Sequence, residues 1–150
     1  MTSLFLALQL WAWAASLRIL KHVVPFEAIV RFVHTNPRRE RSEDFERRLE
    51  TYMASNRAFP RRAPGNCLER SLGAYRLLCA AGSRPDVVVG VRRGTGGVPV
   101  EGHVWLTIDG RPIAERAEFL QTFSVVVTYD GWGRQRHVAP AAALAGARFA

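Results

Sequence analysis

The chain has 150 residues, of which 48% are hydrophobic and 23% charged, and its 21 Lys and Arg against 13 Asp and Glu give a formal net charge of +8. A chain of this length can fold as one domain without a disulfide or a metal, and its apolar content disfavours disorder. Its two cysteines, Cys67 and Cys79, exclude a disulfide scaffold and a thiolate-rich zinc site, and the four histidines form no ligand-spaced pair.

The positive charge favours an acidic partner, and nucleic acid, anionic lipid or an acidic peptide would each fit. The basic residues occur in short clusters at residues 37–41, 57–62 and 91–93. They do not form a periodic stripe with interleaved aromatic residues, so we expect no nucleic-acid binding.

Residues 2–20 are apolar at nearly every position and carry no charge before Arg18, which predicts a helix. A membrane-spanning helix needs about 20 apolar residues, whereas this run contains Gln9 and is soon followed by Lys21. A signal peptide fits poorly, because nothing basic precedes the run. We expect a helix packed on its own domain or on a partner, with membrane contact through residues 1–24 as the alternative.

Two further helices are expected before the sequence changes in character. Pro25 breaks the first helix, and apolar residues then recur at helical spacing until the Asn-Pro pair at 36–37 ends a second one. Ser42 fits the N-cap of a third, amphipathic helix, and the proline-containing residues 57–65 form a connector. We interpret residues 1–64 as an N-terminal helical extension.

From Gly65 onward the pattern predicts a helix and then strands. Asn66 fits the N-cap of a helix that begins at Cys67, buries one apolar face, and ends near Ala81 before Gly82, a residue that readily takes the left-handed conformation of a helix end. Four strands are predicted to follow, at residues 86–91, 102–108, 112–115 and 123–128.

These elements predict an α+β fold with a small antiparallel sheet packed on the helix. The second and third strands form a hairpin through the Asp-Gly pair at 109–110. We place the core at residues 65–133 and interpret residues 134–150 as a C-terminal tail that is a weak, Ala-rich helix or disordered.

Two residues of this core carry candidate chemistry. Cys67 is expected in the first turn of a helix, where unpaired backbone N–H groups and the helix dipole favour a thiolate. Cys79 lies on the buried face of the same helix, about 18 Å of rise away, and is interpreted as a core thiol. His103 shares one strand face with Trp105 and Thr107. An imidazole facing Cys67 would take the thiol proton and later protonate a leaving amine, although each residue alone is more often structural.

A third group must accept the other N–H of the imidazole, and two acids are candidates. Asp109 lies about 20 Å along the strand from His103 and is the natural hairpin-turn residue. Glu115 returns alongside His103 and faces it if the turn has three residues, 109–111, whereas a two-residue turn would point Glu115 to the other face. We favour Glu115 over Asp109.

The order of Cys at a helix start, His on a following strand and an acid on its neighbour is that of the transglutaminase-like cysteine hydrolases. Three blocks narrow the resemblance: residues 66–78 (NCLERSLGAYRLL), 89–94 (VGVRRG) and 102–112 (GHVWLTIDGRP). They closely resemble the lasso-peptide leader peptidases, the microcin-processing B proteins. The resemblance covers residues 65 to about 128 and implies a transglutaminase/papain-like peptidase core.

The resemblance also implies roles for individual residues. Cys67 is the implied nucleophile, His103 its base and Glu115 the orienting acid, at a position that the family usually fills with Asp. The backbone N–H of Cys67 is a natural oxyanion donor, and Asn66 is a candidate for the second. The family's cut follows a leader with Thr near its end, which implies a small pocket near Trp105.

The implied reaction removes the leader from a lasso-peptide precursor and needs no metal or organic cofactor. A separate ATP-dependent lasso cyclase then closes the ring, and a separate leader-recognition protein presents the precursor, so both are implied partners. The cytoplasm, with its reduced thiols, suits a cysteine nucleophile.

Two other functions compete with this one. The chain could be a basic binding or scaffold protein in which Cys67 and His103 fill core positions. It could also be a transglutaminase-like acyl transferase that delivers the acyl group to an amine instead of water.

Overall fold

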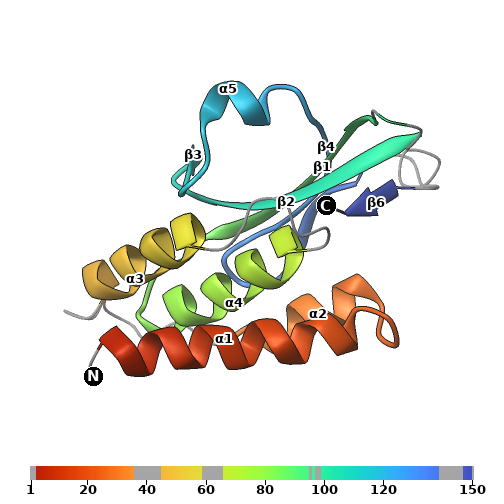
Figure 1. Ribbon diagram of the computed structural model, residues 1–150. Coiled ribbons are helices and arrows are strands. Elements are labelled where there is room, and N and C mark those ends of the chain that lie inside the picture. Colours follow the sequence, from red (N-terminus) through yellow and green to blue (C-terminus); the bar gives the residue numbers. More distant parts are fainter. Residues whose placement is uncertain are drawn as a thin grey trace.

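The computed structural model describes residues 3–35, 45–58, 66–94, 96, 99–138 and 147–149. The longer helices pack beneath one face of a twisted sheet, and a short helix lies over the opposite face (Figure 1). The helices are α1 (Ser3–Leu20), α2 (Phe26–Val33), α3 (Phe45–Ala58), α4 (Asn66–Ala80) and the short α5 (Ala117–Leu120). The strands are β1 (Asp86–Arg93), β2 (Val100–Ile108), β3 (Arg111–Pro112), β4 (Ser124–Tyr129), β5 (Gln135–Val138) and β6 (Ala147–Phe149).

The sheet is built around β1, which pairs antiparallel with β2 on one side and with β4 on the other. The strand order is β3-β2-β1-β4-β5, and β6 pairs parallel with β2. The apolar runs of β1 and β4 fit these positions, because inner strands are covered on both faces. The α+β fold predicted from the sequence is therefore confirmed.

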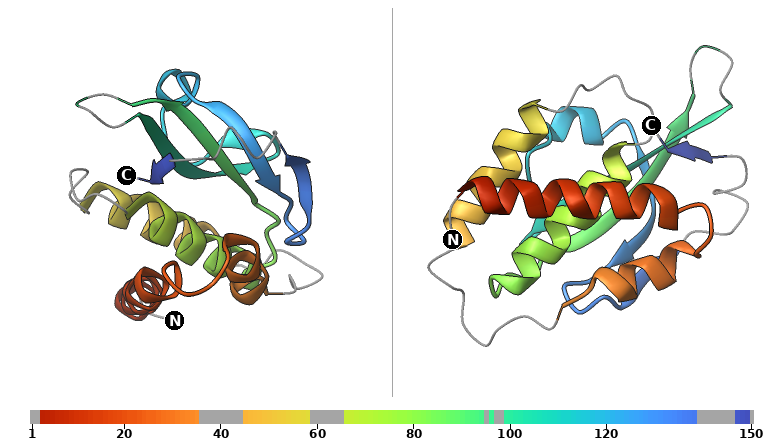
Figure 2. Two further views of the ribbon diagram at one scale, coloured as in Figure 1. Left: turned by 90° about the vertical axis from the view of Figure 1, so that its right-hand side faces the viewer. Right: turned by 60° about the horizontal axis from the view of Figure 1, so that its bottom comes forward.

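Helix α4 is the centre of the hydrophobic core, and both the sheet and the front helices pack on it. Its side chains Leu72, Tyr75, Leu78 and Cys79 are fully buried. Leu17 of α1 belongs to the same core. The front helices thus share one core with the sheet, and Figure 2 shows α1 crossing the side of α4 that faces away from the strands.

The outer side of α1 is less covered than its inner side. Leu4, Leu8, Trp11 and Ile19 are each more than half exposed. Among the helices that the structure describes, none combines the length and the apolar character needed to cross a bilayer.

The C-terminal end of α4 has the cap that the sequence predicts. Gly82 adopts a φ of 86°, and its N–H donates to the Cys79 carbonyl at 2.9 Å while Ser83 N–H donates to the Leu78 carbonyl at 3.0 Å. This pair of bonds is a Schellman motif, which satisfies carbonyls that the last turn leaves unpaired.

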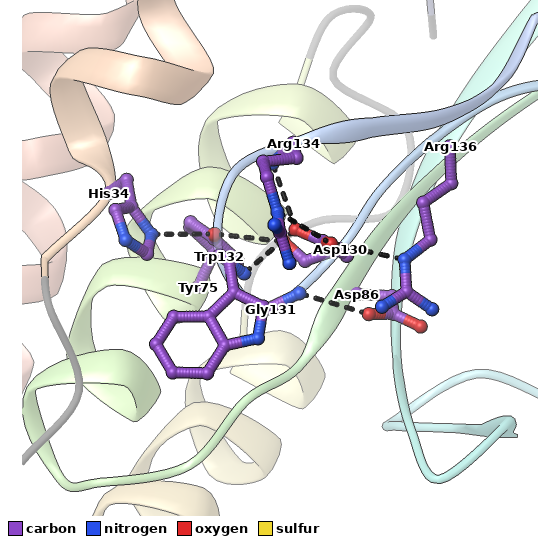
Figure 3. A network of polar contacts seen from close by, with 8 residues as sticks. All are labelled: His34, Tyr75, Asp86, Asp130, Gly131, Trp132, Arg134 and Arg136. Atoms are coloured by element: carbon purple, nitrogen blue, oxygen red, sulfur yellow. Dashed lines mark hydrogen bonds and ion pairs between the residues drawn. The ribbon is translucent and has the colours of Figure 1, made fainter. Parts of the chain in front are cut away.

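A polar network at this end of α4 anchors the β4–β5 hairpin (Figure 3). The Tyr75 hydroxyl lies 2.9 Å from His34 Nδ1 and donates to the Asp130 carbonyl oxygen at 3.3 Å. The buried Asp130 carboxylate accepts the Arg134 backbone N–H at 2.9 Å and Arg136 Nε–H at 3.1 Å. Burial raises the pKa of this carboxyl, but the hydrogen bonds and the Arg charges outweigh burial and lower the pKa overall.

The structure corrects three predictions about the smaller elements. The third strand ends at Pro112 instead of residue 115, and helix α5 follows where no element was expected. The tail was predicted to be an Ala-rich helix or disordered, but residues 135–138 and 147–149 are strands. The expected helix end at 36–37 and the N-cap at Ser42 lie outside the described residues, as does most of the 57–65 connector.

Candidate active site

The N-terminal part of α4 docks on the outer edge of β2. That edge pairs with β6 at residues 100–102 and with β3 at residues 107–108. Between these two pairings, the Ser71 hydroxyl donates a hydrogen bond to the main-chain oxygen of Val104 at 2.9 Å. Cys67 lies one helical turn before Ser71 on the same face of α4. This docking places the thiol beside His103, the neighbour of Val104 in β2.

His103 is 8% exposed and lies between a thiol and a carboxylate. Its Nε2 lies 3.5 Å from Glu115 Oε1, a contact of the ion-pair type rather than a short hydrogen bond. Burial opposes the charged imidazolium, but the polar contacts with Cys67 and Glu115 and their negative charges outweigh burial. Together they raise the pKa of His103 from 6.5 to about 9. The imidazole is therefore held in its protonated form at neutral pH.

Glu115 reaches His103 by a route that the sequence did not reveal. The hairpin turn has two residues, since Ile108 pairs with Arg111, and Asp109 and Gly110 take φ values of 51° and 76°. With a two-residue turn, strand alternation would place Glu115 on the face of the sheet away from His103. The chain leaves the ladder, however, and Ala114 adopts a left-handed φ of 61°. This backbone reversal brings the Glu115 carboxylate back to His103.

Asp109, the alternative acid, occupies the turn and is exposed. Of the two acids, Glu115 is the one that the structure brings to the imidazole.

An aromatic cluster holds the outer face of His103. The Trp105 ring stacks on the imidazole at 6.0 Å and 21° between planes, and Phe119 meets it edge-on at 5.4 Å. Phe123 lies at 5.3 Å, and the guanidinium of Arg92 sits over its ring at 4.5 Å. These contacts restrict the imidazole to an orientation suited to both neighbours.

Trp105 belongs to a buried cluster, and the small pocket that the resemblance implied near it stays a prediction. Its indole is 5% exposed and packs with Val88, Leu120 and Phe123. Sequence patterns do not reveal this cluster, because Leu120 and Phe123 meet Val88 and Trp105 only through tertiary packing.

Tyr52 of α3 is a second residue that sequence patterns could mark only as apolar. It is 2% exposed. Burial, followed by the negative charge of Glu115, raises the pKa of its phenol to about 12. The charge of Arg70 and a hydrogen bond with Ser71 lower this pKa, and the charge of Cys67 raises it. The phenol is therefore a protonated hydroxyl beside the candidate site residues.

Cys79 occupies the core, as predicted. It is fully buried, and burial raises its pKa to about 12 despite a hydrogen bond with Tyr75 that lowers it. No cluster of three or more His, Cys, Asp or Glu side chains suited to a metal ion occurs among the residues that the structure describes.

Comparison with known families adds independent support for the fold. A profile of the transglutaminase-like superfamily matches residues 11–128. The chain belongs to the transglutaminase-like superfamily. The match begins within α1, so it includes front helices as well as the sheet. This superfamily includes cysteine proteases and acyltransferases. Searches of curated proteins and of solved structures give no significant match.

Proposed function

We propose that this transglutaminase-like protein is the cysteine peptidase that removes the leader from a lasso-peptide precursor. The supporting observation is the arrangement of Cys67, at the start of α4, beside a buried His103 that contacts Glu115. A thiol, an imidazole and a carboxylate in this order are the components of a cysteine nucleophile, its base and an orienting acid.

The reaction follows from the charges of these groups. Cys67 as thiolate attacks the carbonyl at the leader–core junction, and the backbone N–H groups at the start of α4 stabilise the oxyanion. The protonated His103 then gives its proton to the leaving amine, which leaves a thioester on Cys67. His103 next takes a proton from water, and the resulting hydroxide attacks the thioester and expels Cys67 as thiolate. The leader leaves as a carboxylic acid that gives its proton to solvent, and the thiolate–imidazolium pair is restored. The Glu115 carboxylate orients the imidazole and stabilises its charge throughout.

The choice of substrate rests on the sequence blocks at residues 66–78, 89–94 and 102–112, which resemble the lasso-peptide leader peptidases. The proposal includes a separate leader-recognition protein, a lasso cyclase that acts on the product, and a cytoplasmic location. It includes no role for nucleic acid. Membrane contact through residues 1–24 remains a separate proposal, motivated by the exposed apolar side chains of α1.

Cleavage of the cognate precursor, followed by mass spectrometry with and without the recognition protein, tests this function. Cys67→Ala and His103→Ala should abolish cleavage, and Glu115→Gln should reduce it at least tenfold. Asp109→Asn and Cys79→Ala are the matched controls and should cut at the wild-type rate. Wild-type protein that does not cut with its partner present, or Cys67→Ala that cuts normally, would refute the proposal.

Two added measurements separate the competing functions. An acyl transferase would convert an added amine into an adduct of the acyl fragment, whereas a peptidase gives the free acid. In a scaffold protein, iodoacetamide would leave Cys67 unmodified at neutral pH, and His103→Ala would change stability alone.

A further inference from the structure

Ser71 is the point at which α4 is fixed to the strand that carries His103. We infer that Ser71 is a positioning residue for the nucleophile: its hydroxyl bond to the Val104 main-chain oxygen sets the spacing between Cys67 and His103. The catalytic part of this inference rests on the proposed function, whereas the effect on thiol reactivity does not.

The bond joins two rigid elements at the right place. Ser71 is 3% exposed, and its hydroxyl donates to the Val104 oxygen at 2.9 Å. Cys67 lies one turn of α4 before Ser71, and His103 lies one residue of β2 before Val104. The helix turn and the strand residue are both stiff, so the separation of thiol and imidazole follows directly from this bond.

The bond also fixes the register of the helix against the strand. The Val104 oxygen points to the outer edge of β2, away from β1, where the neighbouring edge carbonyl of Leu106 accepts the Ile113 N–H. A slip of α4 by one residue of β2 would move Cys67 by about 3.3 Å and leave a buried carbonyl unpaired. Such a displacement is large enough to separate a nucleophile from its base.

Tyr52 of α3 makes a second contact with Ser71. Its phenol contacts the Ser71 hydroxyl and lies within the electrostatic reach of Cys67 and Glu115. Because the Ser71 proton points to Val104, the hydroxyl that donates between Ser71 and Tyr52 is the phenol. Helix α3 is thereby tied to the same bond that positions the nucleophile.

The test compares deletions of buried hydroxyls close to Cys67 with a deletion one turn farther along α4. Ser71→Ala and Tyr52→Phe remove hydroxyls close to Cys67, and Ser71→Thr retains one. Tyr75→Phe is the matched control, since it removes a fully buried hydroxyl of the same helix at the network with His34 and Asp130.

The readout is the rate of iodoacetamide modification at Cys67 between pH 5 and pH 10, located by peptide mass spectrometry. We expect Ser71→Ala to lower the rate at pH 7 at least tenfold and to change the shape of the pH profile. Tyr52→Phe should also lower the modification rate at pH 7, and Ser71→Thr should give a rate close to that of wild type. Tyr75→Phe should lower the melting temperature while its profile matches that of wild type.

A Ser71→Ala profile that coincides with wild type, or an equal change in Tyr75→Phe, would overturn the inference. In the cleavage assay, Ser71→Ala should lower kcat with KM unchanged, because Ser71 is only 3% exposed and acts through the position of Cys67. A protein whose thiol reactivity depends on Ser71 but which cuts no precursor would refute the proposed function and leave the positioning role intact.

Discussion

Replacing Gly90 with alanine tests whether the aromatic packing over the sheet holds His103 in place. Gly90 lies directly opposite His103 in the β1–β2 ladder. A Cβ at this position would lie 2.8 Å from Cη2 and 2.9 Å from Cζ3 of Trp105, and 3.0 Å from Cβ of Phe123. The Phe123 Cβ is attached to the backbone, so the indole is the group that must move.

The contact distances give the size of the effect. Restoring ordinary van der Waals separation requires the indole to move by about 0.6–1 Å, and overpacking of this kind costs about 1–3 kcal/mol. For a domain of this size we expect a decrease in melting temperature of about 2–12 °C. The displaced indole stacks on His103. Under the proposed function, His103 would shift with the indole, and a misplacement of this size costs up to about 100-fold in rate.

Thermal unfolding and the iodoacetamide rate at Cys67 measure the two effects separately. Gly90→Ala should lower both, and Trp105→Phe in the same chain should recover part of each, because the phenylalanine ring lacks the two atoms that clash. Unchanged stability and reactivity in Gly90→Ala would refute the reasoning. A double variant no better than Gly90→Ala would show that the strain lies elsewhere.

Three further predictions concern charged groups. The pKa of His103 is raised to about 9 in the folded protein. Protonated His103 therefore stabilises the fold fully below about pH 6.5, and this contribution is lost as pH rises through 9. Cleavage should therefore decline with a limb near pH 9, recorded as a pH–rate profile. Lys21→Met should cost about 3–5 kcal/mol in urea unfolding, because Glu69, whose side chain is 4% exposed, pairs with Lys21 at 2.9 Å. Adding Glu69→Gln should recover most of that loss. Asp130→Asn should cost about 2 kcal/mol and weaken the loss of stability on acidification, because the lowered pKa of Asp130 contributes stability at neutral pH that is lost as pH falls below about 4.

The elements that sequence patterns predicted correctly carry strong local signals. The helices show apolar residues at helical spacing, the hairpin has an Asp-Gly turn, and α4 is capped by Gly82, which takes a positive φ. The elements that were missed depend on distant contacts. β6 has three residues and exists through its pairing with β2, and α5 has four, too few to form a stable helix without the packing of Leu120.

The candidate site could be predicted in composition but not in geometry. Residue types and their order indicated Cys67, His103 and Glu115. The path of Glu115 depends on the positive φ of Ala114, a conformation that alanine rarely adopts and that no sequence pattern indicates. Tyr52 reaches the site through α3 packing on α4, which periodicity alone does not reveal.

The covering of the β2 edge also bears on how the protein folds in concentrated solution. An uncovered strand edge offers free N–H and carbonyl groups to other chains, and natural sheets cover or charge such edges. Here the protection comes from α4, β3 and β6, which reach β2 from three separate parts of the chain. A folding intermediate whose sheet has formed before α4 docks would expose the edge beside Val104 and invite intermolecular pairing. Refolding at low protein concentration should accordingly give the higher yield, and loss of the docking bond would lower that yield even where the final fold is kept.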